Sequence, residues 1–236
     1  MNELLFVTDV SPYRFPGQGE MIAGVHQSLG SAAIVLAEIA ALSGLSFRHA
    51  SQVSDVTVDD LRVARVLALY TIGETPWTLA QREVVEARAA SGALGIVGLH
   101  SASDAAYEWP AIGELLGGRF GGHPITGDLP LTVLDSEHPA TAHLPSPWRF
   151  HDELYLFQEM APDVHVLLAV ELNGAEAVSL PLAWCVERPP MRSFYTALGH
   201  FVAAYEDANY LQHVQGGIEW VLGQGRAAPI SPPDPA

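Results

Sequence analysis

Lysine is absent from this chain, and cysteine occurs once. All eleven basic residues are arginines, and the one thiol is Cys185. Without lysine the chain cannot form a Schiff base, hold pyridoxal phosphate covalently or build a phosphate-binding loop of the lysine type. A single cysteine excludes an internal disulfide and any multi-cysteine metal site. Because Cys185 stands in the apolar run LPLAWCVE, we expect a buried, inert thiol and not a nucleophile.

Positive charge and long hydrophobic runs are also scarce. Eleven basic residues face 27 acidic ones, which gives a net charge of −16. Such a surface repels nucleic-acid phosphates and anionic membranes, so neither is an expected partner. No segment approaches the roughly 20 continuous apolar residues of a membrane-spanning helix. The opening MNELLFVTDV has no basic stretch before its apolar run and is typical of a strand, not a signal peptide. We therefore expect a cytoplasmic protein.

What is present is enough apolar material for a large core, since 49% of the residues are hydrophobic. We predict a single domain over residues 1–225 and a loose proline-rich tail over 226–236. In the first half, buried strand patterns alternate with helical ones, which predicts a parallel sheet covered on both faces. The expected strands cover residues 3–10, 45–50, 65–70 and 93–99.

After Leu99 the pattern changes to several short β runs in succession. This predicts antiparallel strands that extend the sheet. Two further helices are expected, over residues 104–118 and 209–223. The fold class is therefore α/β, a three-layer sandwich with a mostly parallel, flavodoxin-like sheet. In such sheets ligands bind beyond the carboxyl ends of the parallel strands.

One turn in the sequence has the setting of a catalytic elbow. Gly98-Leu-His-Ser-Ala102 joins a buried strand to a helical segment, as the GxSxG motif of hydrolases does, but His100 occupies the nucleophile position. An imidazole there can act as a base or as a metal ligand. It is a poor substitute for a thiolate in forming an acyl intermediate.

The same stretch carries a family resemblance. GIVGLHSASDAAYEWPAIGELLGGRFGGHP, then DSEHPATAHLPSPWRFHDELY, PLAWCVERPPMRSFYTALGH and GGIEWVLG follow one another between residues 93 and 223. In this order they resemble the trehalose-utilisation (ThuA-like) family. That family is similar in fold to the class I glutamine amidotransferases. Because the elbow cysteine of those enzymes is missing here, the resemblance does not imply glutaminase activity.

The resemblance and the residue chemistry together suggest a site. The expected catalytic residues are His100, Asp104, Asp152, Glu153 and His200. The Asp-Glu pair is the recurrent part of its segment in the family, and Asp104 has the alternative role of a helix cap. The family's Arg-His pair in the first loop is interrupted here, because Arg14 is followed by Phe15.

Three more residues are expected to bind substrate. If the first loop carries an insertion, His26 takes the place of the family's first-loop histidine. Tyr107 and Trp109 can stack on a sugar ring, although packing of a helix on the sheet explains them equally well. His123, His138 and His143 lie among prolines and are interpreted as surface or turn residues.

A divalent metal such as zinc is a further hypothesis. His100, His200 and Glu153 would supply two imidazoles and a carboxylate, which suit zinc. These residues lack the short spacing of a specific metal motif. The strongly negative chain would not repel a cation.

The resulting functional hypothesis is an enzyme of carbohydrate utilisation. Its substrate would be a small carbohydrate (trehalose, a related disaccharide or a keto derivative), and its reaction a hydrolysis, isomerisation or elimination. The alternative is a non-catalytic sugar-binding or assembly protein on an amidotransferase-like scaffold. Self-association as a homo-oligomer is left open.

Overall fold

The computed structural model describes residues 2–10, 27–172, 177–224 and 229–232. One mixed sheet of nine strands forms the centre of this part of the chain, in the order β2-β1-β3-β4-β9-β8-β7-β5-β6. The strands are β1 (Glu3–Val10), β2 (Ser46–Ala50), β3 (Ala64–Ile72), β4 (Gly95–Leu99), β5 (Arg119–Val133), β6 (Trp148–Gln158), β7 (Val164–Leu172), β8 (Val178–Arg188) and β9 (Met191–Thr196).

The strand directions confirm the predicted mixed sheet. β2, β1, β3, β4 and β9 run parallel to one another, whereas β8, β7, β5 and β6 pair antiparallel. The central parallel strands β1, β3 and β4 are rich in apolar residues, and all five residues of β4 are buried. Such strands need cover on both faces, because every side chain of the strand points into a core.

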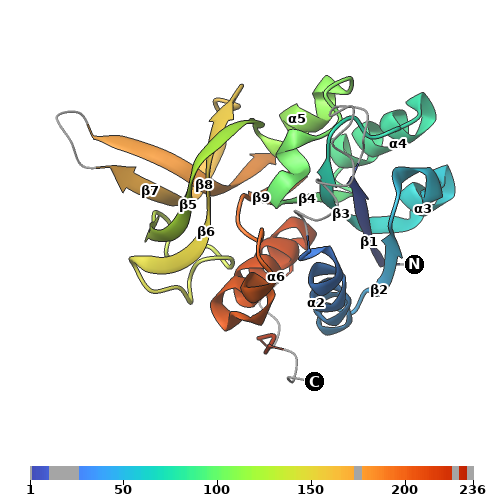
Figure 1. The fold of residues 1–236 in the computed structure, drawn as a ribbon. Coiled ribbons are helices and arrows are strands. Elements are labelled where there is room, and N and C mark those ends of the chain that lie inside the picture. Colours follow the sequence, from blue (N-terminus) through green and yellow to red (C-terminus); the bar gives the residue numbers. More distant parts are fainter. Residues whose placement is uncertain (1, 11–26, 173–176, 225–228, 233–236) are drawn as a thin grey trace.

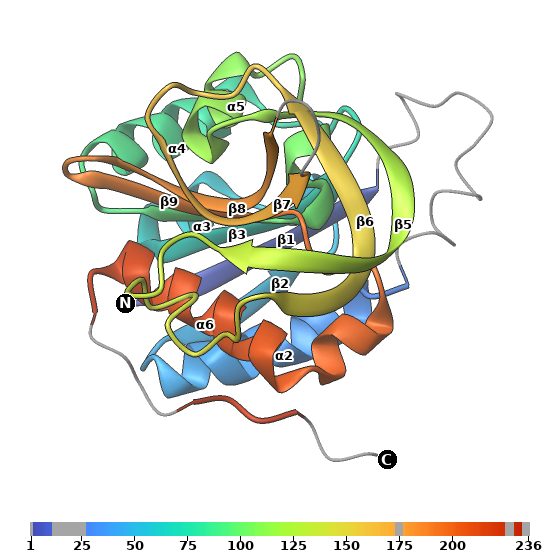
Figure 2. The same ribbon diagram turned by 90° about the vertical axis from the view of Figure 1, so that its left-hand side faces the viewer.

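Helices supply that cover. They are α2 (Leu29–Leu42), α3 (Val58–Val63), α4 (Leu79–Ala90), α5 (Pro110–Leu116) and α6 (Ala208–Leu222). In Figures 1 and 2, α2 and α6 lie on one face of the sheet, and α3, α4 and α5 lie on the other. The long strands β5 and β6 curve around one end of the sheet (Figure 2). No helix in the described residues is long and apolar enough to cross a membrane.

Three parts of the chain differ from the sequence-based prediction. The sequence predicts one helix over residues 104–118. In the structure a short 3₁₀ helix, η3 (His100–Asp104), ends at Asp104, and the α-helix that follows, α5, begins only at Pro110. Proline at the first helical position is favourable, because its missing N–H has no partner there. The first of the β runs expected after Leu99 is PLTVLD, which starts at Pro130, whereas β5 begins eleven residues earlier, at Arg119, since the glycine-rich stretch pairs with β6. In the tail, Ile230 is buried, and its N–H donates to Gln215 Oε1 at 2.9 Å.

The order of the strands determines where the site lies. β9 is the fifth of nine strands and has β4 as its parallel neighbour. Both strands therefore end at the same edge of the sheet, with His100 directly after β4 and His200 four residues after β9. The central position of β9 therefore brings His200 to the same edge of the sheet as His100. The segment after β1, which includes His26, lies outside the described residues.

Candidate active site: a histidine–carboxylate cluster

His100 is the centre of a buried polar cluster at the ends of β4 and β9. Its φ angle is 45°, a left-handed conformation that is uncommon for residues other than glycine. The residue is fully buried. Its backbone carbonyl accepts a hydrogen bond of 2.6 Å from Tyr195 Oη, which also contacts Ser103 Oγ at 2.8 Å. These contacts hold the turn in the sharp conformation that the elbow pattern predicts.

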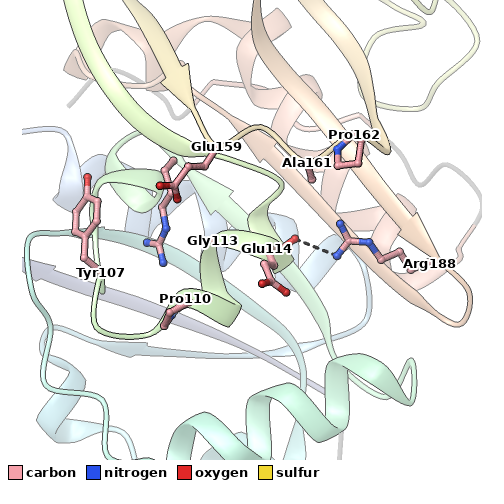
Figure 3. Close-up of a pocket in the computed structure, with 9 residues that line it drawn as sticks. Tyr107, Pro110, Gly113, Glu114, Glu159, Ala161, Pro162 and Arg188 are labelled. Carbon is pink, nitrogen blue, oxygen red and sulfur yellow. Dashed lines mark hydrogen bonds between the residues drawn. The ribbon is translucent and has the colours of Figure 1, made fainter.

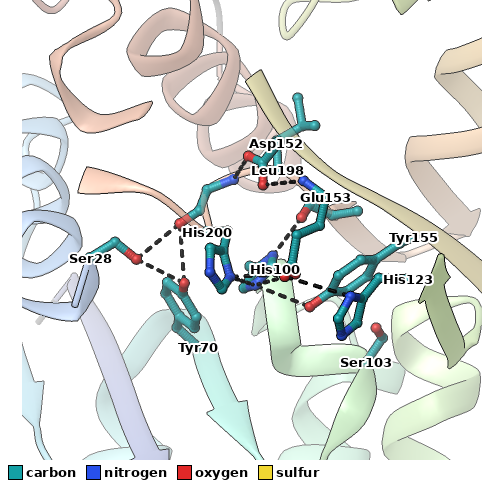
Figure 4. Close-up of polar contacts among 12 residues, drawn as sticks. Ser28, Tyr70, His100, Ser103, His123, Asp152, Glu153, Tyr155, Leu198 and His200 are labelled. Carbon is teal, nitrogen blue, oxygen red and sulfur yellow. Dashed lines mark hydrogen bonds and ion pairs between the residues drawn. The ribbon is translucent and has the colours of Figure 1, made fainter. Parts of the chain in front are cut away.

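The hydrogen bonds of His100 define its protonation pattern. Nδ1 lies 2.7 Å from the carbonyl oxygen of Ala197, which can only accept, so Nδ1 carries the proton. In the neutral ring, Nε2 then presents a lone pair. Tyr155 Oη and His200 Nδ1 each lie 3.0 Å from Nε2 (Figure 4). The unprotonated Nε2 of His100 is therefore within hydrogen-bond distance of both Tyr155 and His200.

Glu153 lies beside this pair of histidines. Its Oε2 is 3.6 Å from His100 Nε2 and 3.4 Å from His200 Nδ1, and its side chain is only 10% exposed. Burial raises the pKa of Glu153, and the nearby His123 acts in the opposite direction. His100, Glu153 and His200 come from three separate segments, and their ligand atoms lie within 4.8 Å of one another. They are the residues here that could hold a metal ion.

His123 completes the cluster on its exposed side, although its sequence context suggested a surface or turn residue. Its Nδ1 is 3.7 Å from Glu153 Oε1, and its side chain is 49% exposed. It lies on β5, where the register with β6 shifts on both sides of Gly122. Irregularities of this kind often redirect a side chain beside an active site. The His-Pro step within the family resemblance was the signal that could have identified it.

Tyr155 also escaped the sequence analysis. Alternation along a strand places residues two apart on one face, so Glu153 predicts the direction of Tyr155. Its ring centroid is 4.8 Å from that of His100 and 4.6 Å from that of Phe120. Burial raises its pKa well above the usual range, so the hydroxyl keeps its proton and can donate to His100 Nε2.

Asp152 points to the other face of β6 and contacts backbone groups. Its Oδ2 accepts the N–H of Gly199 at 2.7 Å, and its Oδ1 accepts the N–H of Glu153 at 2.8 Å. Burial raises the pKa of Asp152 to about 7, against the lowering effect of these backbone donors. The Gly199 carbonyl in turn accepts hydrogen bonds from Ser28 Oγ and Tyr70 Oη. These contacts make Asp152 a positioning residue for the loop that carries His200.

Among the described residues, Asp104, Tyr107 and Trp109 lie outside the cluster. Asp104 accepts a hydrogen bond of 2.5 Å from Tyr107 Oη and does not cap α5, which is preceded by Trp109. The indole of Trp109 is buried and donates to Glu86 Oε1 at 2.6 Å. It packs against Trp77, with ring centroids 5.5 Å apart. Trp109 is thus a packing residue, as in the alternative considered above, but these two partners lie on α4 and just before it and not on the sheet.

A cavity of about 610 Å³ lies beside α5 and the start of β5 (Figure 3). Tyr107, Arg119, Glu159 and Arg188 are among its lining residues. The buried guanidinium of Arg119 donates to backbone carbonyls, among them those of Ala105 and Trp109, and Arg188 pairs with Asp163. The protein itself engages both cations, and none of the predicted catalytic residues lines this cavity.

Cys185 behaves as its apolar context predicts. The thiol is buried, and burial raises its pKa to about 12. A thiol that keeps its proton is a weak nucleophile. The cysteine chemistry of glutamine amidotransferases therefore has no counterpart at Cys185.

The fold and this cluster define an α/β protein with a histidine–carboxylate site at the ends of its central parallel strands. A family model described as "Trehalose utilisation" (ThuA) matches residues 19–221, and the chain belongs to this family. No curated protein sequence matches it.

Solved structures show the same fold. A ThuA-like protein from Bacteroides uniformis is 20% identical, with 93% of this chain and 91% of that chain covered and a TM-score of 0.70. One from Parabacteroides merdae is 19% identical, with 94% and 90% covered and a TM-score of 0.71. The carbohydrate deacetylase Agd3 is 14% identical, with 94% of this chain and 32% of that chain covered and a TM-score of 0.58.

Proposed function

We propose that this chain is an enzyme of carbohydrate utilisation whose reaction centre is formed by His100, Glu153 and His200. Family membership supports the substrate class, which is trehalose, a related disaccharide or its keto form. The observation that carries the proposal is the convergence of these three side chains from segments distant in sequence. Polar groups buried together at strand ends are costly for stability, so their presence there favours a functional role.

The geometry suggests how the site handles protons. Because His100 Nδ1 donates to Ala197, Nε2 is the basic atom that faces the cluster. Glu153 is the complementary carboxyl group at 3.6 Å. A base and an acid in one buried site suit proton transfer to a glycosidic oxygen, from a water molecule or a sugar hydroxyl, or from a carbon next to a keto group. Hydrolysis, isomerisation and elimination all include such a step.

Turnover of defined sugars tests this proposal. The purified protein and its His100→Asn variant would be incubated with trehalose and with its keto form, each with and without a divalent metal. We expect consumption by the wild type and loss of it in the variant. His165→Asn is the matched control, because His165 is an exposed histidine on β7 that pairs with Asp135. If the wild type consumes neither sugar, the substrate assignment is wrong; tight binding without turnover would instead indicate a sugar-binding protein.

A further inference from the structure

The distances within the cluster are those of a metal site. The three edges between His100 Nε2, His200 Nδ1 and Glu153 Oε2 measure 3.0, 3.4 and 3.6 Å. Ligands held tetrahedrally at zinc's usual bond length of about 2.0–2.1 Å lie about 3.3–3.4 Å apart. The three atoms therefore form one face of a tetrahedron of the right size.

The protonation pattern of His100 supports the same interpretation. With Nδ1 committed to Ala197, the unprotonated Nε2 of His100 is the ring nitrogen that lies 3.6 Å from Glu153 Oε2. Tyr155 Oη is within hydrogen-bond distance of the same Nε2, and a metal ion bound there would take the place of that hydrogen bond. A backbone carbonyl that fixes the far nitrogen of an imidazole is also the usual outer support of a metal-binding histidine.

Burial and charge complete the argument. His100 is fully buried, and the side chains of Glu153 and His200 are 10% and 12% exposed. Two neutral imidazoles and one carboxylate give a site with a single negative charge, which favours a divalent cation. Three protein ligands leave a fourth position open, as in catalytic zinc sites.

We propose that His100, Glu153 and His200 bind one divalent transition-metal ion, with zinc as the first candidate. This deepens the proposed function, because the open position would take an oxygen of the sugar and the ion would polarise it. In the loaded site His100 and Glu153 hold the ion, so acid–base work passes to a neighbouring group. His123 is suited to that work, since it is half exposed and 3.7 Å from the other oxygen of Glu153.

Metal binding can be measured without any substrate. The full chain, purified without chelator or histidine tag, would be assayed for bound metal, then stripped and titrated with Zn²⁺ by calorimetry. Co²⁺ would report geometry, because tetrahedral Co²⁺ has intense visible absorption. We expect one ion per chain, and an affinity that falls in Glu153→Gln and His200→Asn by more than the ~10–100-fold typical of outer-shell changes. His165→Asn should bind as the wild type does.

Several outcomes would overturn the proposal. One is the absence of both bound metal and Zn²⁺ binding; another is binding that survives in Glu153→Gln and His200→Asn, or that disappears in His165→Asn. Circular dichroism of each stripped variant separates loss of the ligand from loss of the fold, and His200→Asn, on a partly exposed loop, is the variant expected to fold best. Because these measurements use no sugar, a failure to bind metal does not decide the substrate class, which the turnover experiment tests separately.

Discussion

The Asp152 carboxylate accepts the backbone N–H of Gly199 at 2.7 Å, which ties the loop before His200 to the strand that carries Glu153. Removing this acceptor takes a hydrogen-bond partner from three backbone N–H groups, those of Gly199, Glu153 and His200. We expect Asp152→Ala to lower the free energy of unfolding by about 1–3 kcal/mol, and Asp152→Asn, which keeps one oxygen, by less. Urea denaturation measures both. If Asp152 acts only through position, Asn should also restore most of the Zn²⁺ affinity that Ala loses.

His100→Asn should separate folding from chemistry. Asparagine tolerates the left-handed conformation at φ 45°, and its amide can donate to Ala197 as Nδ1 does. It has no counterpart of Nε2. We expect a melting temperature close to that of the wild type and a turnover reduced about 10²–10⁴-fold, the usual contribution of an acid–base group. Near-wild-type turnover in a folded variant would remove His100 from the mechanism.

Glycine is required at position 199, both because a side chain has no room there and because of the backbone conformation. Its φ angle is 113°, and an added Cβ would lie 2.3 Å from Tyr210 Oη. We expect Gly199→Ala to destabilise the protein by about 1–3 kcal/mol and to displace His200. In Gly199→Ala/Tyr210→Phe the clashing hydroxyl is gone, so part of that loss should be recovered. Thermal denaturation of the three variants, with Tyr210→Phe as the single control, tests this. Equal stability of the single and double alanine variants would contradict the steric account.

His123→Asn should affect activity without affecting the fold. The side chain is 49% exposed and contributes little to the core. We expect an unchanged melting temperature, retained Zn²⁺ binding and a reduced turnover whose pH profile differs from that of the wild type. Retained activity with an unchanged profile would assign proton transfer to another group.

Buried histidines make stability depend on acid pH. Burial lowers the pKa of His213 from 6.5 to about 3. Between these values the unfolded chain binds a proton that the folded protein does not. The contribution of neutral His213 to the free energy of unfolding is therefore complete above about pH 6.5. It is lost as the pH falls toward 3, at up to about 1.4 kcal/mol per pH unit. Burial of His138, whose pKa falls to about 4, acts in the same direction.

His213→Asn isolates one of these groups. Its amide can keep the hydrogen bond that Nδ1 donates to the Ala140 carbonyl at 2.8 Å, but it does not titrate. We expect a lower stability than the wild type at pH 8, from the smaller side chain, and a shallower loss between pH 6 and pH 4. Urea denaturation at several pH values measures the slope. A slope equal to that of the wild type would mean that His213 titrates alike in both states.

Local patterns predicted much of the fold. Buried apolar runs indicate parallel strands, and the succession of β runs after Leu99 indicated the antiparallel extension. The start of β5 was missed because glycine and proline suggest a loop, whereas pairing with β6 holds that segment extended. The interval between Asp104 and α5 was missed because helical periodicity in the sequence does not show where the chain interrupts a helix.

The site could be predicted only in part. His100 has a local signal, the elbow after a buried strand, and Tyr155 follows from alternation along β6. The position of His123 beside Glu153 depends on the β5–β6 register and its two shifts, which no local pattern encodes. Likewise, the separation of Asp152 from the cluster depends on which face of β6 meets the histidines. Contacts between segments distant in sequence therefore determine both the position of His123 and the orientation of Asp152.

The position of β9 has a consequence for synthesis of the chain. Among the described residues β9 is the last strand along the chain, yet it lies between β4 and β8 in the sheet. In a nascent chain that has emerged only as far as β8, the edges of β4 and β8 that pair with β9 are both unpaired. Such a chain also lacks His200. Such open edges are sites of mispairing. Termination before β9, which begins at Met191, would therefore produce a fragment with most of the sheet, no complete cluster and two unpaired strand edges.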